Sequence, residues 1–151
     1  MFKPIAASLV LLSTTALGLA APEQCLRAAD MEAEQAIRFQ TELMVMSDTC
    51  GQETYVHFAT RNRDAISAYQ HQMIDRFRRD GTPRAEARFD TYVTRLANQI
   101  SMRAGAQPVT ALCHEAADFL ATADTMDQEK FRHLAADRAA MNRGEERRCV
   151  E

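Results

Sequence analysis

The sequence predicts an all-α protein, an up-and-down bundle of four long helices followed by a shorter C-terminal helix, stapled by two disulfides. Three observations predict this fold. Apolar residues recur three and four positions apart through most of the chain, which is the spacing of one helix face. Alternating, strand-like runs are absent apart from residues 91–94, which lie within a longer helical pattern. Glycine and proline end these patterns, and the short connections favour antiparallel neighbours.

The first helix is expected between Leu26 and Cys50. Gly51 follows directly, and glycine can adopt the left-handed conformation that closes many helices. This helix has one apolar stripe that includes Leu26, Ala33, Ile37 and Met44.

A second apolar line on the same helix is formed by Phe39, Leu43 and Met46. A helix that is apolar on two sides is either central to its own fold or presents a surface to a partner. The pattern favours burial, with the C-terminal helix as the cover. The alternative is an exposed interface for an envelope protein or a second copy of the chain.

The second and third helices are separated by Asp80-Gly81. Residues 55–77 keep the helical spacing over six turns, which predicts one continuous helix. Thr82 is expected to cap the third helix, because Pro83 then falls at the first helical position, where its missing N–H costs nothing. The apolar face of this helix spans residues 89–100.

The last two helices follow a turn at Gly105 and Pro108. Residues 109–120 predict the fourth long helix. Thr125 and Gln128 have the spacing of a capping box, and an apolar face extending to Met141 follows them.

Two amides interrupt the apolar stripes, Gln40 on the first helix and Asn62 on the second. A buried amide without partners is costly, so such residues commonly determine how helices align. We expect a structural role for both, with ligand binding as the alternative.

Residues 1–20 are predicted to be a signal peptide. Lys3 precedes an apolar stretch, and Gly18 and Ala20 form a small-x-small cleavage pattern. The stretch is short for a membrane span, and no stable membrane insertion is expected after cleavage. Residues 21–151 are then expected to form a single helical domain that is periplasmic or secreted.

The chain has four cysteines, an even number that predicts two disulfides in an exported protein. No Cys-x-x-Cys pair indicates a metal or redox centre. In an up-and-down bundle, Cys50 at the end of the first helix and Cys113 near the start of the fourth lie at the same end. The predicted bridges are therefore Cys50–Cys113 and Cys25–Cys149.

The charge is mildly acidic, with 18 Lys and Arg against 21 Asp and Glu, which does not suggest a nucleic-acid partner. Each of the four histidines has an acidic residue one helical turn away. Such neighbours are usually solvated charge pairs, although they can also bind metals. The pairs are His57 with Glu53, His71 with Asp75, His114 with Asp118, and His133 with Glu129 and Asp137.

The sequence contains no catalytic motif, phosphate-binding loop or cofactor signature. It therefore predicts a non-enzymatic binding or interaction module and assigns no catalytic, cofactor-binding or metal-binding residue. The alternative is a metal-binding or enzymatic helical bundle that uses the histidine and carboxylate pairs.

Overall fold

A computed structural model describes residues 27–142, and every regular element in this range is a helix. The all-α prediction is confirmed for this range. The predicted signal peptide, Cys25 and Cys149 lie outside the described residues. The helices are α1 (Ala28–Thr49), α2 (Thr54–Arg61), α3 (Arg63–Arg79), α4 (Ala85–Ala104), α5 (Val109–Glu115), α6 (Ala117–Asp124) and α7 (Gln128–Met141).

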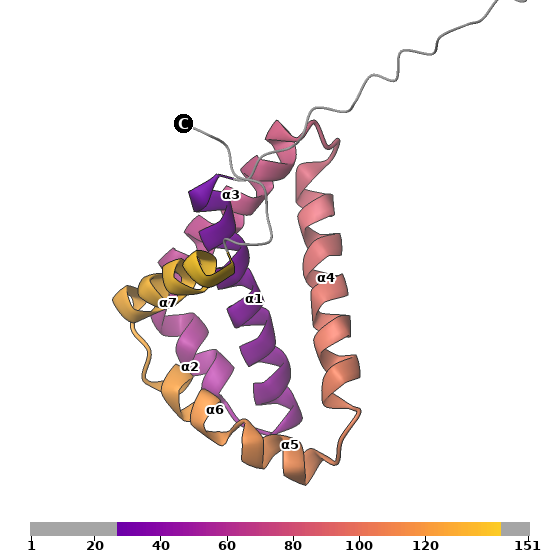
Figure 1. Cartoon of the computed structure of the whole chain (residues 1–151), viewed down its shortest axis with the longest axis vertical. Helices are drawn as coiled ribbons and strands as arrows, with labels where there is room; N and C mark the ends of the chain where they lie inside the picture. Colours follow the sequence, from indigo (N-terminus) through magenta and orange to yellow (C-terminus); the bar gives the residue numbers. More distant parts are fainter. Residues whose placement is uncertain (1–26, 143–151) are drawn as a thin grey trace, which may run out of the picture.

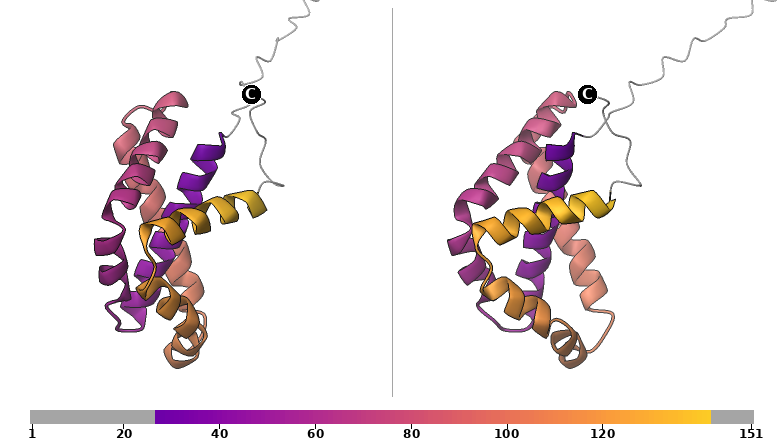
Figure 2. Two further views of the ribbon diagram at one scale, coloured as in Figure 1. Left: turned by 90° about the vertical axis from the view of Figure 1, so that its left-hand side faces the viewer. Right: turned by 60° about the vertical axis from the view of Figure 1, so that its left-hand side comes forward.

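The long axis of the fold is formed by α1, by α2 and α3 in succession, and by α4 (Figure 1). In Figure 1, α1 runs downward, α2 and α3 return upward, and α4 runs downward again. The remaining helices depart from a four-helix bundle. The short helices α5 and α6 close the lower end, and α7 lies across α1 (Figure 2).

The predicted fourth long helix is instead two short ones, separated at Ala116. This break lets the two halves contact different neighbours, because α5 is bonded to the end of α1 through a disulfide while α6 packs against α2. The amphipathic pattern of residues 109–120 is the same in both arrangements, so the sequence did not distinguish them.

The predicted second helix is also divided, by a turn at Asn62 between α2 and α3. The Asn62 Nδ2 atom donates hydrogen bonds to the carbonyl oxygens of Phe58, at 2.9 Å, and Met126, at 3.0 Å. Side-chain amides compete in this way with regular helical bonding. Because of the turn, α2 packs against α6 and α3 packs against α1 and α4.

The core is built around α1, which contacts each of the other six helices of the described chain. Phe39 of α1 meets Phe58 of α2 and Phe131 of α7, with ring centroids 5.5 and 5.8 Å apart. Phe58 and Phe131 are themselves 4.9 Å apart in an edge-to-face arrangement, which is a favourable geometry for aromatic rings.

The apolar line of α1 is covered inside the monomer. Phe39 is 2% exposed, Leu43 is 0% exposed, and Met46 is partly buried against the same core. The C-terminal helix α7 supplies part of the cover through Phe131, and the Arg138 guanidinium lies 5.1 Å from the Phe39 ring centroid. The alternative of an exposed interface at Phe39, Leu43 and Met46 is therefore wrong, and the burial alternative describes the fold.

Two predicted helix starts are wrong. Helix α4 begins at Ala85, and the preceding Arg84 has a left-handed backbone with φ 56°. Helix α7 is capped by Asp127, whose Oδ1 atom accepts a hydrogen bond from Lys130 N at 2.9 Å. The extended backbone of Asp127 allows this contact, whereas Thr125 is the residue that ends α6. At its other end, α7 leaves Met141 exposed rather than on an apolar face.

Polar contacts join the first half of α1 to α3. The buried Asp30 accepts hydrogen bonds from Gln72 and Arg79, at 2.6 and 2.5 Å. One turn further, Glu34 accepts from Arg76 at 2.8 Å and from Arg38. Burial by itself raises the pKa of Glu34, but the hydrogen bonds and the positive charges of Arg76 and Arg38 together outweigh it, so the pKa is lowered.

Across residues 27–142, none of the helices combines the length and the apolar character that a membrane span requires.

Candidate functional site

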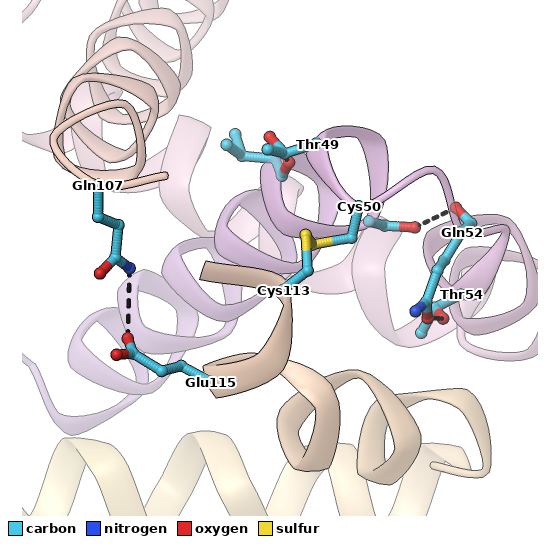
Figure 3. Close-up of a disulfide and its surroundings, with 9 residues drawn as sticks. Thr49, Cys50, Gln52, Thr54, Gln107, Cys113 and Glu115 are labelled. Carbon is cyan, nitrogen blue, oxygen red and sulfur yellow. Dashed lines mark hydrogen bonds between the residues drawn. A yellow bond between two sulfur atoms is a disulfide. The ribbon is translucent and has the colours of Figure 1, made fainter. Parts of the chain in front are cut away.

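The lower end of the fold is organised by a disulfide between Cys50 and Cys113, with a Cα–Cα distance of 5.6 Å. Figure 3 shows this bond joining the end of α1 to α5, with Gln52 and Thr54 beside it. The bridge is the one that the helix order predicted for these two cysteines. Its physical origin is that three successive long elements bring residue 50 and residue 113 to the same end.

The turn that follows α1 is held by Ser47, a buried residue of the last helical turn. The Ser47 Oγ atom donates to the Gln52 carbonyl oxygen at 2.6 Å and accepts from the Tyr55 backbone N–H at 3.1 Å. Gly51 has φ 63°, a left-handed conformation that glycine adopts without steric cost. One hydroxyl therefore ties the end of α1 to the start of α2.

Beside this turn, residues of α1, α2 and α4 line a pocket of about 480 Å³ that is open to solvent. Its apolar floor includes Val45, which packs with Leu96 and Ile100 of α4. Two α4 residues four positions apart, Ala97 and Ser101, line it from that helix. The lining residues are Met44, Val45, Ser47, Asp48, Thr49, Gln52, Tyr55, Val56, Ala97 and Ser101.

Some polar side chains of this pocket, but not that of Asp48, already have hydrogen-bond partners among residues 27–142. The Thr49 hydroxyl donates to the Val45 carbonyl oxygen at 2.7 Å. The Tyr55 hydroxyl accepts from Gln40 Nε2 at 3.2 Å, which gives Gln40 a contact between α1 and α2. The Asp48 carboxylate is exposed and makes no side-chain hydrogen bond or ion pair to any other residue in the described part of the chain.

A second concavity, of about 510 Å³, lies on the other side of α2, against α6. Here the His57 Nδ1 atom is 2.8 Å from Asp124 Oδ1, and His57 Nε2 is 4.0 Å from Glu53 Oε2. Sequence reasoning missed Asp124 as a partner of His57, because no local pattern connects residues that far apart. Arg61 adds a contact to the same turn by donating to the Asp124 carbonyl oxygen at 2.6 Å.

Of the other predicted histidine pairs, the one between His133 and Glu129 is present, on an exposed surface. His71 is near Ser67 rather than Asp75, which instead pairs with Arg78. His133 lies 3.9 Å from Glu129 with both side chains largely exposed, and His114 is exposed on α5. Within residues 27–142, no three His, Cys, Asp or Glu side chains gather in a way that could hold a metal ion.

Asn62 is fully buried, and the described residues offer its Oδ1 atom no hydrogen-bond partner. The burial of Asn62 is explained by its Nδ2 atom, which donates to the Met126 carbonyl oxygen and so joins the α2–α3 turn to that segment. Gln40 joins α1 to α2 through Tyr55, and Asn62 joins the α2–α3 turn to the segment between α6 and α7, so both amides make structural contacts.

Comparison of the chain with protein-family models, with curated proteins and with solved structures finds no match. The class of the protein is therefore defined by its own features: an all-helical fold with a disulfide and an open pocket at one end.

Proposed function

We propose that this protein is an exported, non-enzymatic binding module that holds a small molecule in the pocket between α1, α2 and α4. The pocket volume of about 480 Å³ falls within the range of typical small-molecule sites. Its composition also supports the proposal, because binding sites commonly combine an apolar surface with a few polar groups that orient the ligand. Val45 and Met44 supply the former, and Asp48, Gln52 and Ser101 supply the latter.

The observation that carries the proposal is the way the pocket wall is held in place. Ser47 at the end of α1 bonds Gln52 of the turn and Tyr55 of α2, and Cys50 at the same end is covalently joined to α5. A wall held by these bonds loses little conformational freedom when a ligand binds, and this lowers the entropic cost of association.

An exported location is supported by two features. Residues 1–20 have the pattern of a signal peptide, and a disulfide persists in oxidising compartments such as the periplasm or the extracellular space. Partners in this proposal are small molecules, and no membrane or nucleic-acid partner is required.

A non-enzymatic role is favoured by the chemistry of the lining. Its ionisable side chains are those of Asp48 and Tyr55, and the described lining holds no histidine or cysteine that could act as a base or nucleophile beside them. The His57–Asp124 pair on the other side of α2 is the basis for an enzymatic alternative. There, however, the neighbouring Thr54 hydroxyl is directed to Gln52 Oε1 at 3.3 Å, so it is not bonded to the imidazole.

A fragment screen with a pocket-filling variant tests the proposal. Uniformly ¹⁵N-labelled protein is titrated with a library of small molecules, and binders are mapped by amide chemical-shift changes. Ser101→Trp places an indole in the pocket, whereas Asn98→Trp places the same group on an exposed position of α4 outside the lining. We expect binders that shift amides of residues 44–56 and that lose affinity in the first variant only.

The proposal fails if the binders keep their affinity in Ser101→Trp while circular dichroism shows that both variants are folded. Shifts confined to the α2–α6 concavity would instead favour the alternative that uses His57 and Asp124.

A further inference from the structure

The pocket between α1, α2 and α4 has an uneven charge. Among the residues that line it, Asp48 is the one that carries a formal charge near neutral pH, and none is lysine, arginine or histidine. Asp48 also makes no side-chain ion pair within the described chain. A carboxylate in this setting is free to pair with a ligand.

The helix that carries Asp48 adds to the negative potential. Asp48 is in the last turn of α1, where the helix macrodipole places partial negative charge, and this turn contains no basic residue that would offset it. The start of α2 has the opposite polarity, but its Tyr55 N–H is already bonded to the Ser47 hydroxyl. The carbonyl oxygens of Met46, Ser47 and Asp48 are likewise bonded, by backbone N–H groups of the turn that follows. The Asp48 carboxylate is therefore the feature that distinguishes the charge of this lining.

Apolar surface lies directly beside this charge. Met44 is one helical turn before Asp48 on α1, so the two side chains share a face. Tyr55 and the exposed Val56 line the pocket from α2. A ligand with one cationic end and one hydrocarbon end would satisfy both parts of the lining at once.

We propose that the pocket selects small amphipathic organic amines, with the ammonium group beside Asp48 and the hydrocarbon part on the surface formed by Met44, Val45 and Tyr55. This inference rests on the proposed function of the same pocket. Carboxylates of equal size should bind more weakly, because they would be repelled by Asp48 and would find no basic side chain in the lining.

A matched set of probes tests the inference: hexylamine, hexanol and hexanoate, which share one hydrocarbon chain and differ in charge. Each is titrated at neutral pH against the ¹⁵N-labelled full mature protein. We expect hexylamine to bind about three- to fivefold more tightly than hexanol, as for one partly solvated ion pair. Hexanoate is expected to bind more weakly than hexanol.

Two variants separate the carboxylate from the overall charge of the protein. Asp48→Asn should reduce hexylamine binding to the level of hexanol and leave hexanol binding unchanged. Asp90→Asn removes an exposed carboxylate of α4 that does not line the pocket, and should preserve the preference for the amine. Salt should weaken hexylamine binding more than hexanol binding, because it screens the ion pair.

Equal affinity for hexylamine and hexanol, with both lost in Ser101→Trp, would overturn the inference and leave the proposed function standing. A preference for hexylamine that survives Asp48→Asn would also overturn it. Binding of all three probes that Ser101→Trp does not alter would overturn the inference and the proposed function together.

Discussion

Asn62 Nδ2 donates a hydrogen bond to the Met126 carbonyl oxygen at 3.0 Å, joining the turn between α2 and α3 to the segment that leads into α7. Both residues are buried. Arg61 makes a second bond close by, because its guanidinium donates to the carbonyl oxygen of Asp124, the last residue of α6, at 2.6 Å. The direction in which α7 leaves α6, and hence the cover over Phe39, is thus tied to the break between α2 and α3.

Replacing Asn62 tests this link. Asn62→Ala removes one donor to the Met126 carbonyl oxygen, which still accepts from Arg61 Nη1 at 3.4 Å. The free energy of unfolding should therefore fall by about 0.5–1.5 kcal/mol, the net contribution of one hydrogen bond. Urea unfolding followed by circular dichroism measures the change. Asn98→Ala, at an exposed position of α4, serves as the control and should have little effect. A stability equal to that of wild type in Asn62→Ala would show that the bond does not hold the turn.

The aromatic cluster under α7 should dominate the stability of the core. Phe131 is 0% exposed and contacts the rings of Phe39, Phe58 and Tyr69. Phe131→Ala is expected to cost about 3–5 kcal/mol, because it removes buried surface and leaves a cavity. Phe131→Leu should cost less. Chemical denaturation measures both variants. A loss of under about 0.5 kcal/mol in Phe131→Ala, which is typical of an exposed position, would contradict the burial of this ring.

The Cys50–Cys113 disulfide should stabilise the fold by restricting the loop that it closes in the unfolded chain. The bond spans 63 residues, and a loop of this size is expected to stabilise the fold by about 4 kcal/mol in the chain-entropy model. The double variant Cys50→Ser, Cys113→Ser should therefore unfold at a lower urea concentration than the wild type. Non-reducing peptide mapping should recover the Cys50 and Cys113 peptides as one species.

The same mapping tests the Cys25–Cys149 bridge, which stays a prediction. A peptide that joined Cys50 to any cysteine other than Cys113 would contradict the structure.

Acid should weaken the contact between α1 and α3 through Glu34. Its pKa is lowered in the folded state, so in the range below its ordinary value of 4.5 the unfolded chain binds the proton more readily. The stability that Glu34 provides is complete above that value and is lost as the pH falls through the folded-state pKa. Glu34→Gln should therefore show a smaller loss of stability on acidification than the wild type.

Urea unfolding at several values between neutral pH and pH 3 measures this slope. Glu53→Gln, which neutralises an exposed carboxylate, is the matched control. An acid slope in Glu34→Gln equal to that of the wild type would rule out this contribution.

Several features of the fold followed from the sequence alone. The three-four apolar spacing predicted helices because it depends only on 3.6 residues per turn, a local property of the backbone. The order of these helices then placed Cys50 and Cys113 at one end, where the structure joins them. Burial of Phe39 was the favoured prediction because a helix with two apolar faces needs cover on both, and the rings of α2 and α7 supply it.

The tertiary structure decided where these helices bend and what their polar side chains meet. Asn62 and Ala116 lie within continuous apolar patterns, yet both mark breaks, and the divided helices pack α2 on α6 and bond α5 to α1. The pairing of His57 with Asp124 and the pocket beside Asp48 arise in the same way. Such features join residues far apart in sequence, so their energies appear only when the helices are packed together.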